Sequence, residues 1–406
     1  MKTQPRKTER LHSLDSLRAI MMLLGLVIHS AITYGIVDYG GSWSLKDPIA
    51  THLSNDLIVG FIHSFRMQLF FLVAGFFGAM LFYERKPIKM LKNRVSRIVF
   101  PFIVFVVLLW PSIVFTFGYT RTLFAGNTNA LEDTLAKFSS LEILIPKSTF
   151  HFWFLYYLAM ITFVSVVVAL VFKKLPVLSN TISNAFSWVI QKTVLRILIF
   201  GCITAVVYFI MGTSSVDTSN SFIPDYNTFM YYFVFYMIGW VLFKSKHLLE
   251  TFVSYDWLNI AIGMLLFFTY AIMRDDFSYE AAIVLKSIMV WCLIFGITGL
   301  FIRFGSRHSA KMRYISDASY WVYLLHLPLT AFLPSLLVDW DIPATFKFLT
   351  VASISTLICF VTYHYFVRST FIGKFLNGRK YSRKLSEIKA LEQPVIPNMT
   401  LVNDKK

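Results

Sequence analysis

Ten apolar runs of membrane-spanning length constrain this chain more than any other feature of its sequence. They lie at about 14–36, 57–82, 98–118, 151–172, 194–212, 228–243, 257–273, 281–302, 317–338 and 345–367. About 20 apolar residues in a helix match the thickness of the hydrocarbon core of a bilayer. No water is present there to bond free backbone groups, so each run must be helical. The sequence therefore predicts an all-α polytopic membrane protein of about ten transmembrane helices.

Composition supports a membrane protein and argues against a nucleic-acid partner. Hydrophobic residues make up 56% of the chain and charged residues only 15%, against about 25% charged in soluble domains. The net charge of +16 does not form one patch, because the basic residues fall at the ends of the apolar runs. Cys202, Cys292 and Cys359 all lie within apolar runs, so they provide neither a disulfide framework nor the spacing of a metal site.

The distribution of Lys and Arg predicts that both termini are cytoplasmic. With the N-terminus inside, the cytoplasmic segments are 1–13, 83–97, 173–193, 244–256, 303–316 and 368–406, and they carry most of the basic residues. The opposite segments are acidic or neutral; they carry Asp38, Asp47, Asp217, Asp225, Asp275, Asp276, Glu280, Asp339 and Asp341. Positive charge is retained on the cytoplasmic side of membrane proteins, which predicts an N-in, C-in topology.

Three regions follow from this topology. Residues 1–13 form a cytoplasmic N-terminus, 14–370 the transmembrane domain and 371–406 a cytoplasmic polar tail. We expect the tail to be exposed from about residue 374, because it is polar and charged. The first apolar run has no small-residue cleavage site after it, which favours a retained span over a removable signal peptide.

The first span carries ionisable residues on one helical face. Asp15, Arg18, Met22, Gly25 and His29 are spaced 3, 4, 3 and 4 residues apart. Arg18 and His29 are separated by about 16 Å along a helix axis. This stripe suits a long thin ligand with an anionic end at Arg18 and a reactive end at His29. Alternatively, Arg18 reaches the membrane surface and His29 bonds a backbone carbonyl.

Two further groups of basic residues lie in the second and third spans. His63 and Arg66 are three residues apart, which places them on one face of a continuous helix. A buried Arg66 needs an anionic partner, from a ligand or from a network between helices. Arg94 and Arg97 are also three residues apart and can grip phosphate. As residues of a cytoplasmic segment, the second pair needs no further function.

The fourth group combines histidine with aromatic residues. His151 and Trp153 begin the fourth span, and His326 lies in the ninth, two residues before Pro328. Such residues occur in sugar-binding clefts, and also in ordinary aromatic belts at membrane interfaces. Pro328 frees a carbonyl one turn earlier and can bend its helix. We expect His364 to be structural.

Several of these motifs together resemble the acyltransferase 3 family of bacterial membrane proteins. They are L-D-S-L-R with a His eleven residues after the Arg, R-V-S-R-I-V-F-P at 94–101, and Y-W-V-Y-L-L-H-L-P at 320–328. The stretches at 55–77 and 151–158 look like the glucans biosynthesis protein C group within that family. The resemblance implies a cytoplasmic acyl-CoA donor, a carbohydrate acceptor and, for this group, succinylation of periplasmic osmoregulated glucans.

The residues and the resemblance together give a mechanistic hypothesis. We expect a bacterial inner-membrane O-acyltransferase that binds no cofactor and uses succinyl-CoA or acetyl-CoA as co-substrate. His29 would be the base, with His63 and Arg66 at the reacting end. Donor binding is assigned to Arg18, Arg94 and Arg97, and acceptor binding to His151, Trp153 and His326.

Two alternatives stay open on the sequence. One is O-acetylation of another surface polysaccharide. The other is a proton-coupled secondary transporter or flippase, in which His29, His63 and Arg66 form a proton or anion site. A transporter explains Arg94 and Arg97 less well, and no internal repeat is visible.

Overall fold

The computed structural model describes residues 11–216, 218–307, 309–384 and 387, and this part of the chain is helical without strands. The α-helices are α1 (His12–Ala31), α2 (Leu53–His63), α3 (Arg66–Arg85), α4 (Pro87–Arg94), α5 (Phe100–Phe124), α6 (Ala130–Lys137), α7 (Trp153–Lys173), α8 (Pro176–Ile190), α9 (Thr193–Met211), α10 (Tyr226–Lys244), α11 (Asp256–Met273), α12 (Tyr279–Gly305), α13 (Ala310–Phe332), α14 (Ala344–Thr362) and α15 (Phe371–Asn377). The predicted all-α fold is confirmed.

Nine helical segments of the described residues are long and apolar enough to cross a membrane. The remaining predicted run, 228–243, which is the sixth along the chain, forms α10, a 19-residue helix that is not among these nine. The protein is therefore a multi-pass membrane protein. Its orientation stays a prediction.

The second predicted span is not one continuous helix. α2 ends at His63, and α3 begins at Arg66 after a Phe65 whose backbone φ is −140°. The Ser64 hydroxyl donates to the carbonyl of Phe61 at 2.7 Å, so the end of α2 is closed by a side chain. The expectation that His63 and Arg66 share one helical face is wrong, because the helix ends between them.

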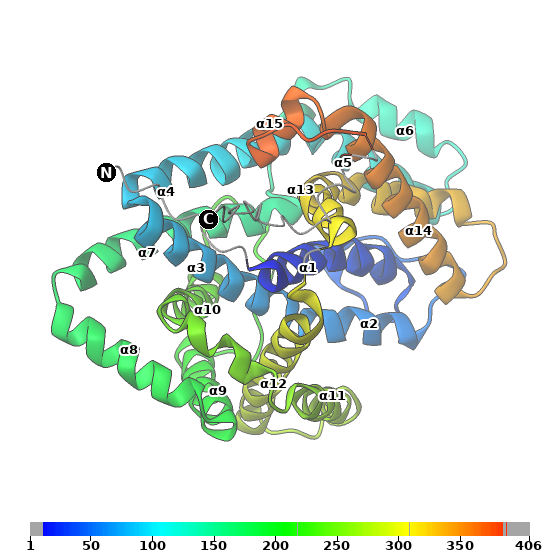
Figure 1. Ribbon diagram of the computed structural model, residues 1–406. Helices are drawn as coiled ribbons and strands as arrows, with labels where there is room; N and C mark the ends of the chain where they lie inside the picture. The colour runs from blue at the N-terminus through cyan, green and yellow to red at the C-terminus, as the bar shows by residue number, and fades with distance from the viewer. Residues whose placement is uncertain (1–10, 217, 308, 385–386, 388–406) are drawn as a thin grey trace, which may run out of the picture.

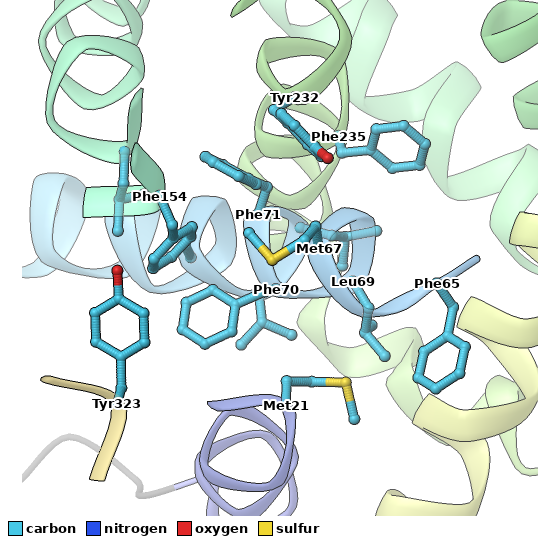
Figure 2. Close-up of a cluster of buried hydrophobic side chains, with 14 of the residues drawn as sticks. Met21, Phe65, Met67, Leu69, Phe70, Phe71, Phe154, Tyr232, Phe235 and Tyr323 are labelled. Atoms are coloured by element: carbon cyan, nitrogen blue, oxygen red, sulfur yellow. The ribbon is translucent and has the colours of Figure 1, made fainter. Parts of the chain in front are cut away.

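α1 occupies the centre of the molecule (Figure 1). It packs against α13, α12, α14 and α3. Figure 2 shows one side of this core, where Phe70 and Leu69 of α3 lie nearest to Met21 of α1, with Phe154 of α7 and Tyr232 of α10 further out. α3 and α10 approach closely because glycines lie where they cross: a Cβ at Gly75 would overlap the backbone of Tyr236.

The chain after the last span folds back onto the bundle. Leu376 of α15 is only 3% exposed. The Arg368 guanidinium donates from Nε to the carbonyl of Ser382 at 2.8 Å, and the backbone N–H of Tyr381 donates to Arg368 at 2.9 Å. The tail expected to be exposed from about residue 374 is thus exposed only in part up to residue 384: Leu376 is buried, whereas Arg379 and Lys380 are exposed. Residues 1–10 of the predicted N-terminus, Asp217, and residues 385–386 and 388–406 of the predicted tail lie outside the described residues. The three-region division stays a prediction.

Candidate active site

Two cavities lie toward opposite ends of α1, and a narrow passage lies between them. Asp15, Arg18 and Met22 line the first cavity, Met22, Gly25 and His29 line the passage, and His29 also lines the second cavity. The predicted stripe along one face of this helix is therefore confirmed. One helix connects both cavities through the interior of the bundle.

The first, which we call the basic cavity, has a volume of about 690 Å³. Five arginines line it: Arg18, Arg85, Arg94, Arg97 and Arg379. Arg18 is paired with Asp15 at 3.5 Å, and Arg97 donates from Nη1 to the carbonyl of Leu376 at 3.0 Å. In contrast, Nε and Nη2 of Arg94 are buried without a partner in the described part of the chain. Among the arginines of this cavity, Arg94 is the one with buried guanidinium nitrogens that have no partner in the described residues.

Local backbone geometry brings Arg94 and Arg97 to the same cavity. Val95–Val99 is a π-helical turn between α4 and α5, and α5 begins with Pro101 in its first turn. A π turn widens the helix locally, and such turns occur often at functional sites. Tyr320 of α13 donates its hydroxyl to the Arg97 carbonyl at 2.9 Å, which ties this turn to the neighbouring helix.

The second, which we call the aromatic cavity, has a volume of about 440 Å³. Its wall includes Tyr39, Trp43, Phe150, Trp153, Tyr232 and Tyr270. Trp43 stacks on His29 with ring centroids 5.1 Å apart, and its Nε1 donates to Thr33 Oγ1 at 3.0 Å. Burial, together with the nearby Asp56 carboxylate, raises the pKa of Tyr39 to about 12, so this phenol stays protonated at neutral pH.

The passage has a volume of only about 30 Å³ and is lined by His29, Arg66, His151 and His326. Gly25 is the residue that leaves room for it. A Cβ placed there would lie 2.6 Å from Nη1 of Arg66 and 3.9 Å from Nε2 of His326. A side chain at position 25 would therefore fill the space between the guanidinium and this imidazole.

Arg66 lies in the passage, and no carboxylate of the described residues pairs with it. Its Nη2 contacts Met67 Sδ at 3.3 Å, and its Nε is buried with no hydrogen-bond partner among the described residues. Desolvating a cation costs several kcal/mol unless an anion or hydrogen-bond acceptors compensate. A negative charge from a ligand would compensate this cation.

Backbone carbonyls fix the orientation of two of the three passage histidines. His326 Nδ1 lies 2.7 Å from the carbonyl of Tyr323, so this nitrogen carries the proton. Pro328 has no N–H, which leaves the carbonyl of Leu324 free of its helical partner. That carbonyl accepts from His151 Nε2 at 3.2 Å. Neither ring nitrogen of His29 has such a partner in the described residues, and its Nδ1 is buried.

The structure places the predicted site residues in the two cavities and the passage. Arg18, Arg94 and Arg97 line the basic cavity; His29, Arg66, His151 and Trp153 line both the passage and the aromatic cavity; His63 lines the aromatic cavity alone and His326 the passage alone. His63 is exposed to the aromatic cavity. His364, which was expected to be structural, lines neither cavity nor the passage, and its Nδ1 lies 3.1 Å from the Tyr314 hydroxyl. Their catalytic and binding roles stay predictions.

Sequence reasoning missed Trp43, Arg379 and Tyr381, and it included Tyr323 only as part of the motif at 320–328. Trp43 lies in the loop after the first span, and Arg379 and Tyr381 lie in the segment expected to be exposed. Nothing in their spacing connects them to the spans. Tyr323 does belong to the motif before Pro328, and its hydroxyl donates to the His151 carbonyl at 2.7 Å.

Comparison with known proteins gives a consistent result. A family model described as an acyltransferase domain matches residues 11–364. Relatives named glucans biosynthesis protein C, from Salmonella paratyphi B and Salmonella gallinarum, are 27% identical over 333 residues, which is 80% of this chain and 83% of each relative. The protein of that name from Salmonella heidelberg is 26% identical over the same coverage. No solved structure matches the chain.

Proposed function

Because the chain belongs to the acyltransferase family whose model spans residues 11–364, we propose that this membrane acyltransferase moves a succinyl group from a cytoplasmic acyl-CoA to a hydroxyl of a periplasmic glucan. The reaction breaks the thioester C–S bond and forms an ester C–O bond. The hydroxyl proton leaves through a base, and the thiolate leaves as CoA. The protein would act in the bacterial inner membrane.

The observation that carries this proposal is the pair of chemically different cavities joined at one passage. Arginine binds phosphate through a planar fork of donors, so the basic cavity suits the phosphates of CoA. Arg94, with two unpartnered nitrogens, is the strongest candidate for a direct phosphate contact. The pantetheine arm would run along α1 past Gly25, so that the thioester reaches the passage.

The aromatic cavity suits a carbohydrate. Rings of Trp and Tyr combine apolar faces with polar atoms at their edges, which matches the alternating faces of a sugar. Trp153 and His151 line both this cavity and the passage, so they would bind the acceptor near the reacting atoms. The relatives named glucans biosynthesis protein C favour a glucan over other polysaccharides.

His29 is the proposed general base. It lines both the passage and the aromatic cavity, where the acceptor hydroxyl would enter. A neutral imidazole can accept a proton at physiological pH, and such catalysis contributes about 10²–10⁴-fold. Arg66 would stabilise negative charge beside it, either the tetrahedral oxyanion or the distal carboxylate of a succinyl group.

Release of free CoA by the purified protein tests this function. We would measure it from succinyl-CoA and from acetyl-CoA, with and without a β-glucan, for the wild type, His29→Ala and the control His364→Ala. Release that is stimulated by the glucan, kept in His364→Ala and lost in His29→Ala supports the proposal and identifies the donor. Release from acetyl-CoA alone would replace succinylation by acetylation. If the folded wild type releases CoA from neither donor, the proposal that the donor is an acyl-CoA is refuted.

A further inference from the structure

His326 lies in the passage with one ring nitrogen held and the other unpartnered. Its side chain is 1% exposed. Nδ1 lies 2.7 Å from the carbonyl of Tyr323 and 3.1 Å from that of Val322. Both acceptors are backbone oxygens, so the proton is on Nδ1 and the lone pair is on Nε2. That Nε2 is buried and has no hydrogen-bond partner in the described part of the chain.

We propose that Nε2 of His326 is a nucleophile that takes the acyl group from the donor and carries it as an acyl-histidine to the acceptor. This inference rests on the proposed acyl transfer, and it adds a covalent intermediate and a second catalytic histidine. A nucleophilic imidazole needs an available lone pair, a fixed orientation and a polar group on its other nitrogen. His326 meets all three requirements, whereas neither nitrogen of His29 is held.

The position of Nε2 also fits this role better than contact with a sugar. His326 lines the passage but not the aromatic cavity. Nε2 lies 3.9 Å from the Cβ position at Gly25, and Nη1 of Arg66 lies 2.6 Å from the same point. An acyl carbon attacked by Nε2 would thus have the guanidinium nearby to stabilise its oxyanion.

The first step is attack on the thioester. Nε2 bonds to the carbonyl carbon, the electron pair of the C=O bond moves to oxygen, and the tetrahedral intermediate collapses with loss of thiolate. The product is an N-acyl imidazolium, because Nδ1 keeps its proton. The carbonyl of Tyr323 stabilises this positive charge through the Nδ1–H bond.

The second step transfers the acyl group to the acceptor. His29 removes the proton from the acceptor hydroxyl as its oxygen bonds to the acyl carbon, and Nε2 of His326 leaves with the electron pair of its C–N bond. The ring centroids of His29 and His326 are 5.3 Å apart, close enough to act on one acyl group. The proton on His29 balances the thiolate that was released.

Two steps suit the narrow passage. At about 30 Å³ it has room for only a few water molecules. With an acyl carrier in this position, CoA can leave the basic cavity before the sugar reacts. Each substrate then needs to occupy only its own cavity.

Exchange between free CoA and acyl-CoA without an acceptor tests this intermediate. We would incubate the full-length protein with isotope-labelled CoA and unlabelled succinyl-CoA, then acetyl-CoA, and measure label in the acyl-CoA. Wild type and the control His364→Gln should exchange. His29→Gln should exchange at a similar rate yet fail to acylate the glucan. His326→Gln should lose both exchange and transfer while still binding CoA, which shows that it is folded.

Other results would overturn the inference without touching the proposed function. Glucan acylation by wild type with no exchange would mean direct attack of the hydroxyl on the thioester. Exchange that persists in His326→Gln would place the nucleophile elsewhere, as would peptide mapping of a trapped acyl group to His29 or His151. If His326→Gln does not bind CoA, the acyl group can still be trapped on the wild type, and peptide mapping then shows whether His326 carries it. The proposed function itself fails only if wild type neither releases CoA nor acylates an acceptor.

Discussion

Arg66 is a cation in the interior of a membrane protein, and the described residues supply it with no anion. Its Nε has no hydrogen-bond partner, and Nη2 contacts only a thioether sulfur. Ionisable groups at such positions are costly and usually mark function. Arg196 of α9 provides a comparison, because it is also buried but donates from Nη1 to the carbonyls of Ile190 and Thr251 and lies over the rings of Phe252 and Phe295. Arg196 thus has acceptors and ring contacts for part of its guanidinium, although its Nε and Nη2 are also unpartnered in the described residues, whereas Arg66 contacts only a thioether sulfur.

Replacing each arginine with leucine should therefore have opposite effects on stability. We expect Arg66→Leu to raise the thermal midpoint of the ligand-free protein in detergent, because it removes an uncompensated buried charge. Arg196→Leu should lower the midpoint, because it removes hydrogen bonds and ring contacts. Arg66→Leu should also lose succinyl transfer. A midpoint that falls equally in both variants would show that Arg66 is structural.

The donor dependence of Arg66→Leu separates the two roles of this residue. If the guanidinium binds a succinyl carboxylate, the variant should prefer acetyl-CoA, since only the charged acyl group loses its partner. If it stabilises the oxyanion, kcat should fall equally with both donors, by about 10²–10³-fold.

At the scale of elements, the segment after α14 completes the basic cavity. Arg379 and Tyr381 line it, and the Arg379 guanidinium lies 4.8 Å from the centroid of the Tyr381 ring. Arg97, which lines the same cavity, donates to Leu376 of α15. Whatever binds in this cavity is thus in contact with the chain that follows the last span.

Arg379→Ala should consequently weaken donor binding. We expect a higher apparent KM for acyl-CoA with little change in the KM for the acceptor, because Arg379 lines the basic cavity and not the aromatic cavity. Loss of one exposed phosphate contact corresponds to about 1 kcal/mol, or about fivefold. Lys380→Ala is the matched control, since Lys380 is adjacent and exposed but does not line the cavity. Equal effects of the two variants would refute a specific role.

The elements also show which features of the site a sequence can reveal. The stripe from Asp15 to His29 was predictable because helical periodicity alone places these residues on one face. The freed carbonyl before Pro328 was predictable as well, because proline always lacks the N–H. The identity of its partner, His151, was not, since 173 residues separate His151 from Leu324. The break at Ser64–Phe65 carries no Gly or Pro, so no local signal marks it.

At the scale of the whole molecule, the spans were predicted because hydrocarbon imposes length and composition on each of them. The cavities were not, because they depend on which helices become neighbours. α1 belongs to both cavities because α13, α12, α14 and α3 surround it. Four segments distant in sequence meet at the passage, with His29 of α1, Arg66 of α3, His151 before α7 and His326 of α13.

The proposed reaction requires the two cavities to open on opposite sides of the membrane. Ser42 lies at the wall of the aromatic cavity and Lys380 beside that of the basic cavity, and both are exposed. We would introduce Ser42→Cys or Lys380→Cys into a variant with Cys202, Cys292 and Cys359 replaced by alanine. A membrane-impermeant maleimide added to spheroplasts should label position 42 at once, and position 380 only after permeabilisation, because the Lys and Arg distribution predicts cytoplasmic termini.

The two other outcomes have different meanings. Labelling of position 380 from outside and of position 42 only after permeabilisation would invert the topology, and a cytoplasmic acyl-CoA could then not reach Arg94. Labelling of positions 42 and 380 from the same side would mean that both cavities open into one compartment. The acyl group would then not have to cross the bundle. Only opposite accessibility, with position 42 outside, makes the passage at Gly25 the route by which an acyl group made in the cytoplasm reaches a periplasmic sugar.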